Sequence, residues 1–151
     1  AGAVAAWRPA AEAGDPDAQL KLSMAYQEGI GVEKDTARAV SWIRKSAEQG
    51  WKDAQAQLGA RYLDGDGVAQ DYAQALVWSQ RAADQGIGLA QNNLGVLHAN
   101  GLGVPRDFVE GYKWFVIAFV NVAPGPQRDA IKRAGSTLAS RMTAEQRAEA
   151  K

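Results

Sequence analysis

Apolar residues in this chain recur at the spacing of short amphipathic helices. Between about 17 and 28, Ala18, Leu22 and Tyr26 stand at i, i+4 and i+8, so they share one face of a predicted helix. A second predicted helix covers about 36–49 and directs four side chains toward the same interior: Ala39, Trp42, Ile43 and Ala47. The pattern therefore predicts a pair of helices with a shared apolar side.

Residues typical of helix ends support these boundaries. Asp15 or Asp17 can cap the first helix by accepting from free backbone amides, and Asp35 can cap the second. Gly-Ile-Gly-Val at 29–32 ends the first helix, because glycine tolerates the left-handed conformation found there. Gly50 ends the second helix. The unit is thus predicted to be a helix–turn–helix hairpin.

The same hairpin occurs three times with a period of 36 residues, over 15–50, 51–86 and 87–122. Chance gives well under about one column identical in all three units at this composition. The alignment has eight such columns: Ala18/Ala54/Ala90, Gln19/Gln55/Gln91, Leu22/Leu58/Leu94, Gly29/Gly65/Gly101, Gly31/Gly67/Gly103, Val32/Val68/Val104, Asp35/Asp71/Asp107 and Trp42/Trp78/Trp114. The period is therefore a property of the fold.

One hairpin cannot bury its own apolar face, so successive hairpins are expected to stack around one continuous core. The repeated tryptophans are predicted to supply much of that core. Small residues beside the core leucines are expected to let neighbouring helices approach closely: Ser23, Gly59 and Gly95.

The two ends of the chain are predicted to cap this stack. Residues 1–14 resemble a partial repeat, since Ala11 is in register with Ala47. Residues 123–151 are predicted to form C-terminal capping helices, one at about 127–141 and a last short one. A capping-box pattern opens the short helix at Thr143 and Gln146. The whole chain, 1–151, is thus predicted to be a single repeat domain.

Composition narrows the possible functions. Seventeen basic and seventeen acidic residues give no net charge, and nucleic-acid binding usually requires a basic surplus. The absence of cysteine excludes disulfides and thiolate metal sites. No apolar run approaches the roughly 20 residues that cross a bilayer, so membrane insertion is not expected.

No catalytic, cofactor-binding or metal-binding residues are predicted. His98 is the only histidine and stands in the column of Tyr26 and Tyr62, where a packing role is expected. Catalytic triads and metal sites need further partners of fixed geometry. The repeated Gly-x-Gly pairs lack the preceding strand and third glycine of a dinucleotide-binding motif.

Three phrases of the second unit carry a family resemblance: Ala-Gln-x-x-Leu-Gly-x-x-Tyr (54–62), Gly-x-Gly-Val-x-x-Asp (65–71) and Ala-x-x-Trp-x-x-x-Ala-Ala-x-x-Gly (75–86). They closely resemble the Sel-1-like repeat, a relative of the tetratricopeptide repeat, over about 15–122. The resemblance implies an all-α, right-handed α-solenoid of helix–turn–helix repeats with terminal capping helices. It also implies an adaptor for protein–protein interaction. The cysteine-rich relatives linked to β-lactam binding or hydrolysis carry a cysteine pair in each repeat. This chain has no cysteine, so an enzyme is not expected.

By this resemblance, the first helix of each unit lines a concave groove that binds a partner protein or peptide. The predicted groove residues lie off the packing columns: Leu20, Met24, Gln27, Glu28, Ala56, Ala60, Leu63, Asp64, Asn92, Val96 and Asn100. Because these columns carry no Lys or Arg, the partner is expected to be neutral or slightly basic. An alternative is that Leu20 and Met24 only fill gaps between helices.

The expected protein is thus a monomeric, bacterial interaction scaffold without a cofactor. Its location is open, with the periplasm or cell surface favoured over the cytoplasm. A structural segment of a larger solenoid is one alternative. A cell-wall or carbohydrate-binding module is another, because Trp51 could stack on sugars, although packing between units is the expected role of Trp51.

Overall fold

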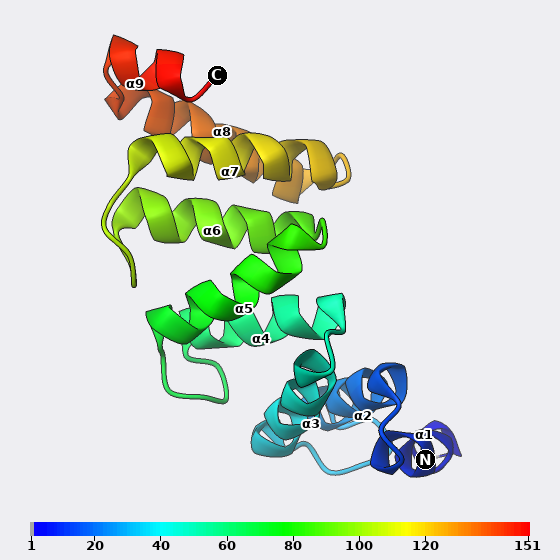
Figure 1. Ribbon diagram of the computed structural model, residues 1–151. Coiled ribbons are helices and arrows are strands. Elements are labelled where there is room, and N and C mark those ends of the chain that lie inside the picture. The colour runs from blue at the N-terminus through cyan, green and yellow to red at the C-terminus, as the bar shows by residue number, and fades with distance from the viewer. Residues whose placement is uncertain (1) are drawn as a thin grey trace.

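A computed structural model describes residues 2–151 of the chain, which form an elongated stack of helices with the two ends far apart (Figure 1). Within this range there are nine helices and no strand, which confirms the predicted all-α solenoid. The helices are α1 (Gly2–Glu12), α2 (Pro16–Glu28), α3 (Thr36–Glu48), α4 (Lys52–Asp64), α5 (Tyr72–Asp84), α6 (Gly88–Asn100), α7 (Phe108–Asn121), α8 (Pro126–Arg141) and α9 (Ala144–Glu149).

The helices pack in the order of the sequence. Helices α2 and α3, α4 and α5, and α6 and α7 form the three hairpins. Each hairpin is joined to the next where its second helix packs against the following first helix, as α3 does against α4. Helices α1 and α8 pack at the two ends in the same manner, so every hairpin has a neighbour on both sides.

The predicted caps of the second helices are present. Asp35, Asp71 and Asp107 each accept a hydrogen bond from the backbone N–H three residues later, at 3.1, 3.1 and 3.0 Å. Of the two candidates before α2, Asp15 is the cap, since its carboxylate accepts from the backbone of Asp17 and Ala18. Recurrence of these aspartates with the repeat therefore has a structural cause.

Leu22, Leu58 and Leu94 are fully buried and form the centre of the stack. The tryptophan column is less uniform than predicted. Trp78 is buried, whereas Trp42 and Trp114 are partly buried and pack at the edge of the core. Trp78 packs between the first two units, in the cluster that holds Leu20, Ile43 and Leu58.

Two of the small residues permit the close helix approach that was expected. A Cβ on Gly59 would lie 2.6 Å from Ser79 Oγ, and a Cβ on Gly95 would lie 2.6 Å from the ring of Phe115. Both distances are far below van der Waals contact, so a larger residue at either position would force the neighbouring side chain to shift.

Each glutamine of the repeated column makes one hydrogen bond to the preceding unit and one within its own unit. The side-chain amide of each glutamine donates to a carbonyl eight residues earlier, at 3.0, 3.3 and 3.2 Å. Its oxygen accepts from a side-chain amide 30 residues later, at 2.9, 2.6 and 2.8 Å. The donors are Gln19, Gln55 and Gln91, the carbonyls belong to Ala11, Ala47 and Ala83, and the later amides belong to Gln49, Gln85 and Asn121. These buried amides are thereby satisfied.

Candidate functional site

The eleven predicted groove residues all lie on the first helices α2, α4 and α6, but the structure separates them by burial. Leu20 is buried against Val40, Ile43 and Leu58, so it belongs to the core between the first two units. This position corresponds to the gap-filling alternative, because the side chain is already covered by the next hairpin. Leu20 is therefore not available to a partner.

Three further residues of the set are shared between the core and the surface. Ala56 and Leu63 are partly buried against the apolar cluster of α5 and α6. Val96 is partly buried against the cluster that joins α7 to the terminal helices. These side chains contribute more to the contact between units than to an open surface.

The remaining residues form an accessible surface on the first helices. Met24 is 54% exposed, and Ala60 occupies the equivalent position on α4. Glu28, Asp64 and Asn100 are exposed at the ends of the three helices, and Gln27 and Asn92 are partly exposed. The accessible surface thus has an apolar centre and an acidic or amide edge, and we refer to it as the first-helix surface.

A shallow pocket of about 210 Å³ lies on this surface at α4, lined by Gln57, Ala60, Arg61, Asp64 and Asp66. Arg61 Nη2 donates to Gln27 Oε1 at 2.8 Å, which connects α4 to α2. Its Nη1 lies 3.3 Å from Asp66 Oδ2, which balances the positive charge. The edge of the surface therefore remains acidic, through Asp64 and Glu28.

Sequence reasoning missed Arg61 as a residue of this surface. Its column holds Ala25 in the first unit and Leu97 in the third, and both are buried. A column that is apolar in two of three units is interpreted as core. The charge of Arg61, which neither equivalent residue shares, is the signal that could have identified it.

Two tyrosines of the repeats have arginine partners. Arg8 Nη2 donates to the hydroxyl of Tyr26 at 3.2 Å, and this bond lowers the pKa of Tyr26 below its ordinary value. Arg44 contacts Tyr62 in the same way in the next unit. Among residues 2–151, no group of three or more His, Cys, Asp or Glu side chains could hold a metal ion. None of the helices described is long and apolar enough to cross a membrane.

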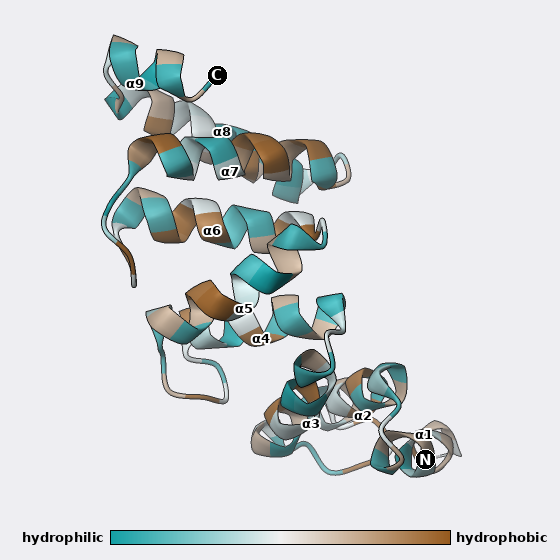
Figure 2. Ribbon diagram, in the orientation of Figure 1, coloured by the Kyte–Doolittle hydropathy of each residue, from teal (hydrophilic) through white to brown (hydrophobic). Residues whose placement is uncertain are grey.

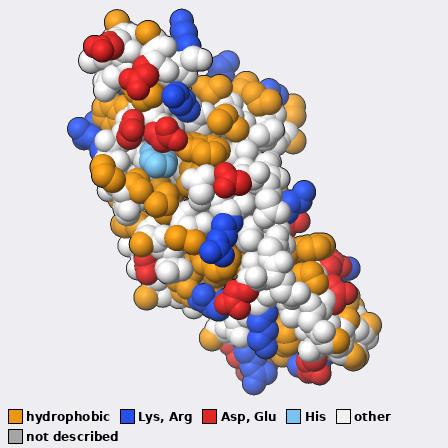
Figure 3. Space-filling model, viewed as in Figure 1, with side chains coloured by type: hydrophobic (Ala, Val, Ile, Leu, Met, Phe, Trp, Pro, Cys, Tyr) orange, Lys and Arg blue, Asp and Glu red, His pale blue; other side chains and the backbone are white. Residues whose placement is uncertain are grey.

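A second accessible apolar surface lies on α7 and was not predicted. Val116, Ile117 and Val120 are 46%, 41% and 72% exposed, and an apolar pocket of about 160 Å³ lies beside them between α7 and α8. Figure 3 shows apolar side chains gathered over the C-terminal half of α7. The available signal was a difference between units, because the equivalent positions of the first two units are polar.

Comparison with known proteins places this arrangement of helices in a family. The model of the Sel1 repeat matches residues 16–51, 52–87 and 88–118. The structure is similar to that of a Sel1 repeat protein from Oxalobacter formigenes, with 34% sequence identity and a TM-score of 0.73, over 89% of this chain and 95% of that one. A comparison with curated proteins found no match.

A second similar structure is that of a protective antigen present in uropathogenic Escherichia coli strains, which displays an SLR fold. It shares 34% sequence identity with this chain at a TM-score of 0.76, and the match covers 95% of this chain. The same match covers 34% of the antigen, so this chain spans about a third of the antigen's length. Three matched repeats, which cover more than half of the sequence, together with these structures show that the chain belongs to the Sel1 repeat family, whose helical repeats generally serve as non-catalytic scaffolds for protein–protein interaction.

Proposed function

We propose that this chain is an interaction scaffold that binds a peptide or a partner protein on the first-helix surface. The observation that carries the proposal is the apolar centre of this surface, where Met24 is exposed and Ala60 is partly exposed. An exposed methionine is adaptable and suits an apolar anchor of varied shape. The amide and carboxylate groups around it can bind the backbone of an extended or helical ligand.

The charge of the surface indicates the kind of partner. Glu28, Asp64 and Asp66 lie along its edge, and Arg61 is already paired with Asp66. A neutral or slightly basic segment is therefore favoured, because an acidic one would meet like charges. Rim charges of this kind affect the association rate and the choice of partner more than the affinity.

The test is an affinity selection of a random peptide library on the folded chain, followed by binding measurements on variants. The double variant Met24→Gln, Ala60→Gln leaves the charge unchanged and removes the apolar centre. The double variant is expected to bind the selected peptides about tenfold or more less tightly than the wild type, since a few central anchors carry most of the binding energy. Ile30→Gln is the matched control, because Ile30 is exposed but lies in the loop after α2. Equal binding by the double variant and the wild type would reject this surface.

A second candidate function is supported by the position of Trp51. Its side chain is 37% exposed and lines a pocket of about 290 Å³ with Lys52, Asp53 and Gln85. Packing of Trp51 between units stays a prediction, because Gln85, which follows α5 in the same unit, shares this pocket and the indole remains accessible. An indole beside polar side chains can stack on a sugar ring. A glycan array probed with the wild type and with Trp51→Ala tests this candidate, and no Trp51-dependent signal would exclude it.

A further inference from the structure

Helix α7 differs from the other second helices in its outer face. Val116, Ile117 and Val120 are exposed there. The equivalent residues are Arg44, Lys45 and Glu48 on α3, and Gln80, Arg81 and Asp84 on α5. Three polar columns of the repeat thus become apolar in the last unit.

The inner face of α7 is apolar as well, since Val109, Phe115 and Ala118 are buried. Figure 2 shows hydrophobic residues from one end of α7 to the other. A helix that buries one apolar face normally presents polar residues on the opposite face. The outer face of α7 therefore has the composition of a covered surface.

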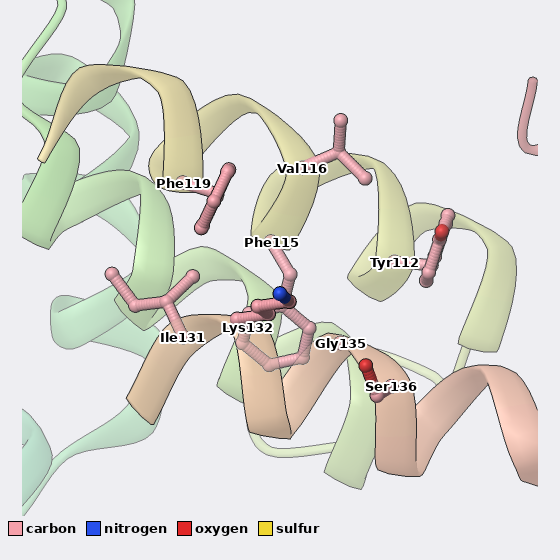
Figure 4. A pocket seen from close by; sticks show the side chains of 8 residues that line it. All are labelled: Tyr112, Phe115, Val116, Phe119, Ile131, Lys132, Gly135 and Ser136. Carbon is pink, nitrogen blue, oxygen red and sulfur yellow. The ribbon is translucent and has the colours of Figure 1, made fainter. Parts of the chain in front are cut away.

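The pocket beside this face has the size of one side chain. Its walls are α7 and α8, with the side chains in Figure 4 lining the space between the two helices: Tyr112, Phe115, Val116, Phe119, Ile131, Lys132, Gly135 and Ser136. Its volume is about 160 Å³. An apolar cavity of about 150 Å³ can hold a benzene ring. A phenylalanine or leucine side chain from a partner would therefore fit.

A local difference in sequence explains why this pocket exists. In the first unit, Arg44 occupies the position of Val116 and contacts Tyr62 of the following helix. In the last unit, Val116 faces the pocket with Gly135 and Ser136 of α8, which have no side chain of comparable length. The space that the Arg–Tyr contact fills between α3 and α4 is left open between α7 and α8.

Basic side chains lie beside the apolar face, and Glu110 lies one turn before Lys113 on α7. Lys113 lies one turn before Val116 on α7, and Lys132 lines the pocket. The guanidinium of Arg128 lies 4.1 Å from the centre of the Phe119 ring. In the part of the chain that the structure describes, the cations within 4.0 Å of a carboxylate are Lys21, Arg38 and Arg61. Lys113, Arg128 and Lys132 therefore have no carboxylate partner at that distance.

We propose that α7 and α8 form a docking surface for an acidic, amphipathic helix of a partner protein. Lys113, Val116, Ile117 and Val120 stand at i, i+3, i+4 and i+7 and form one stripe about 10 Å long, which matches two turns of an incoming helix. One large apolar side chain of that helix fills the pocket, and flanking Glu or Asp side chains meet Lys113 and Lys132. This surface is separate from the first-helix surface, so each can be tested without the other.

The probes are two synthetic helical peptides of equal length with Phe and Leu at i, i+3, i+4 and i+7. One carries Glu at the flanking positions and the other carries Lys. The Glu peptide is expected to bind with amide chemical-shift changes confined to α7 and α8, and about fivefold more tightly than the Lys peptide. The double variant Val116→Gln, Val120→Gln should lower the affinity for the Glu peptide by about tenfold or more. The double variant Lys113→Gln, Lys132→Gln should lower the same affinity by about fivefold.

Three controls separate the outcomes. Val77→Gln changes an equally exposed valine on α5 and should leave binding unchanged. The variant Met24→Gln, Ala60→Gln should bind the Glu peptide like the wild type, which distinguishes this surface from the first-helix surface. All substituted side chains are exposed or partly exposed, and unchanged thermal melts verify the fold.

Some results would overturn the proposal. Equal affinity for the two peptides removes the role of the basic rim. Unchanged binding to Val116→Gln, Val120→Gln removes the role of the apolar face. Dimers seen in sedimentation equilibrium that disappear in this variant would assign the face to a second copy of the chain.

Discussion

Replacing Trp78 by alanine should destabilise the stack more than any change at its surface. Trp78 lies on α5, is 6% exposed and packs in the cluster that holds Leu20, Ile43 and Leu58, so it joins the first and second units. Burying an indole removes about 150–250 Å² from water, which corresponds to about 4–6 kcal/mol at about 25 cal/mol/Å². Partial relaxation of the cavity reduces the expected loss to about 3–5 kcal/mol.

The environment of the indole nitrogen refines this estimate. Trp78 Nε1 is buried and has no hydrogen-bond partner. An unpaired buried donor costs about 1–3 kcal/mol, so tryptophan is not ideal at this position. Trp78→Phe keeps most of the ring packing and removes the donor. Its cost should therefore be less than half that of Trp78→Ala.

The assay is urea denaturation followed by far-ultraviolet circular dichroism, with coincidence of a second probe to verify two-state unfolding. Trp42→Ala is the matched comparison, because Trp42 occupies the same column but is only partly buried. It should cost clearly less than Trp78→Ala. A loss below about 1.5 kcal/mol for Trp78→Ala, or equal losses for the Phe and Ala variants, would refute the packing argument.

Four other changes test three separate parts of the structure. Gln55→Leu should lower the free energy of unfolding by about 1–3 kcal/mol in urea titrations, since it removes a buried donor to Ala47 of the preceding unit and an acceptor for Gln85 of its own unit. Gly59→Ala should lower the melting temperature because the new Cβ has no room, whereas Gly135→Ala meets its nearest atom at 3.6 Å and should be neutral or stabilising. Arg8→Gln should move the absorbance titration of Tyr26 to higher pH, toward its ordinary pKa. Because the folded pKa of Tyr26 is lowered, its contribution to stability increases as the pH rises through that folded value, and Arg8→Gln should diminish this increase.

The fold could be predicted from the sequence because its signals are local and repeated. Asp35 precedes its helix and accepts from that helix alone, so the cap can be recognised without tertiary information. Leu22 and its equivalents have the helical spacing of a core face, and all are buried. Each such signal is weak alone, but three copies at one spacing leave little ambiguity.

The surface was harder to predict, because the contact between units depends on how the helices cross. Leu20 and Met24 lie on the same stripe of α2, yet Leu20 is covered by the next hairpin and Met24 is exposed. Periodicity cannot separate two neighbouring positions of one stripe. The identical glutamines were recognised as a column, but their partners, 30 residues away, could be identified only from the packed structure.

In a repeat protein whose buried contacts are the same in every unit, the residues that differ between units must determine which partners bind. The identical Leu and Gln columns are buried in all three units, so they have no contact with solvent or with a ligand. The outer columns are free of that constraint, and along the stack they change from charged at Lys45 to apolar at Ile117. A buried column therefore reports how the units stack, whereas an exposed column that changes in one unit indicates where a partner binds. By that criterion, the apolar outer face of α7 is the strongest departure from the repeat, and it is the departure that packing within the chain does not explain.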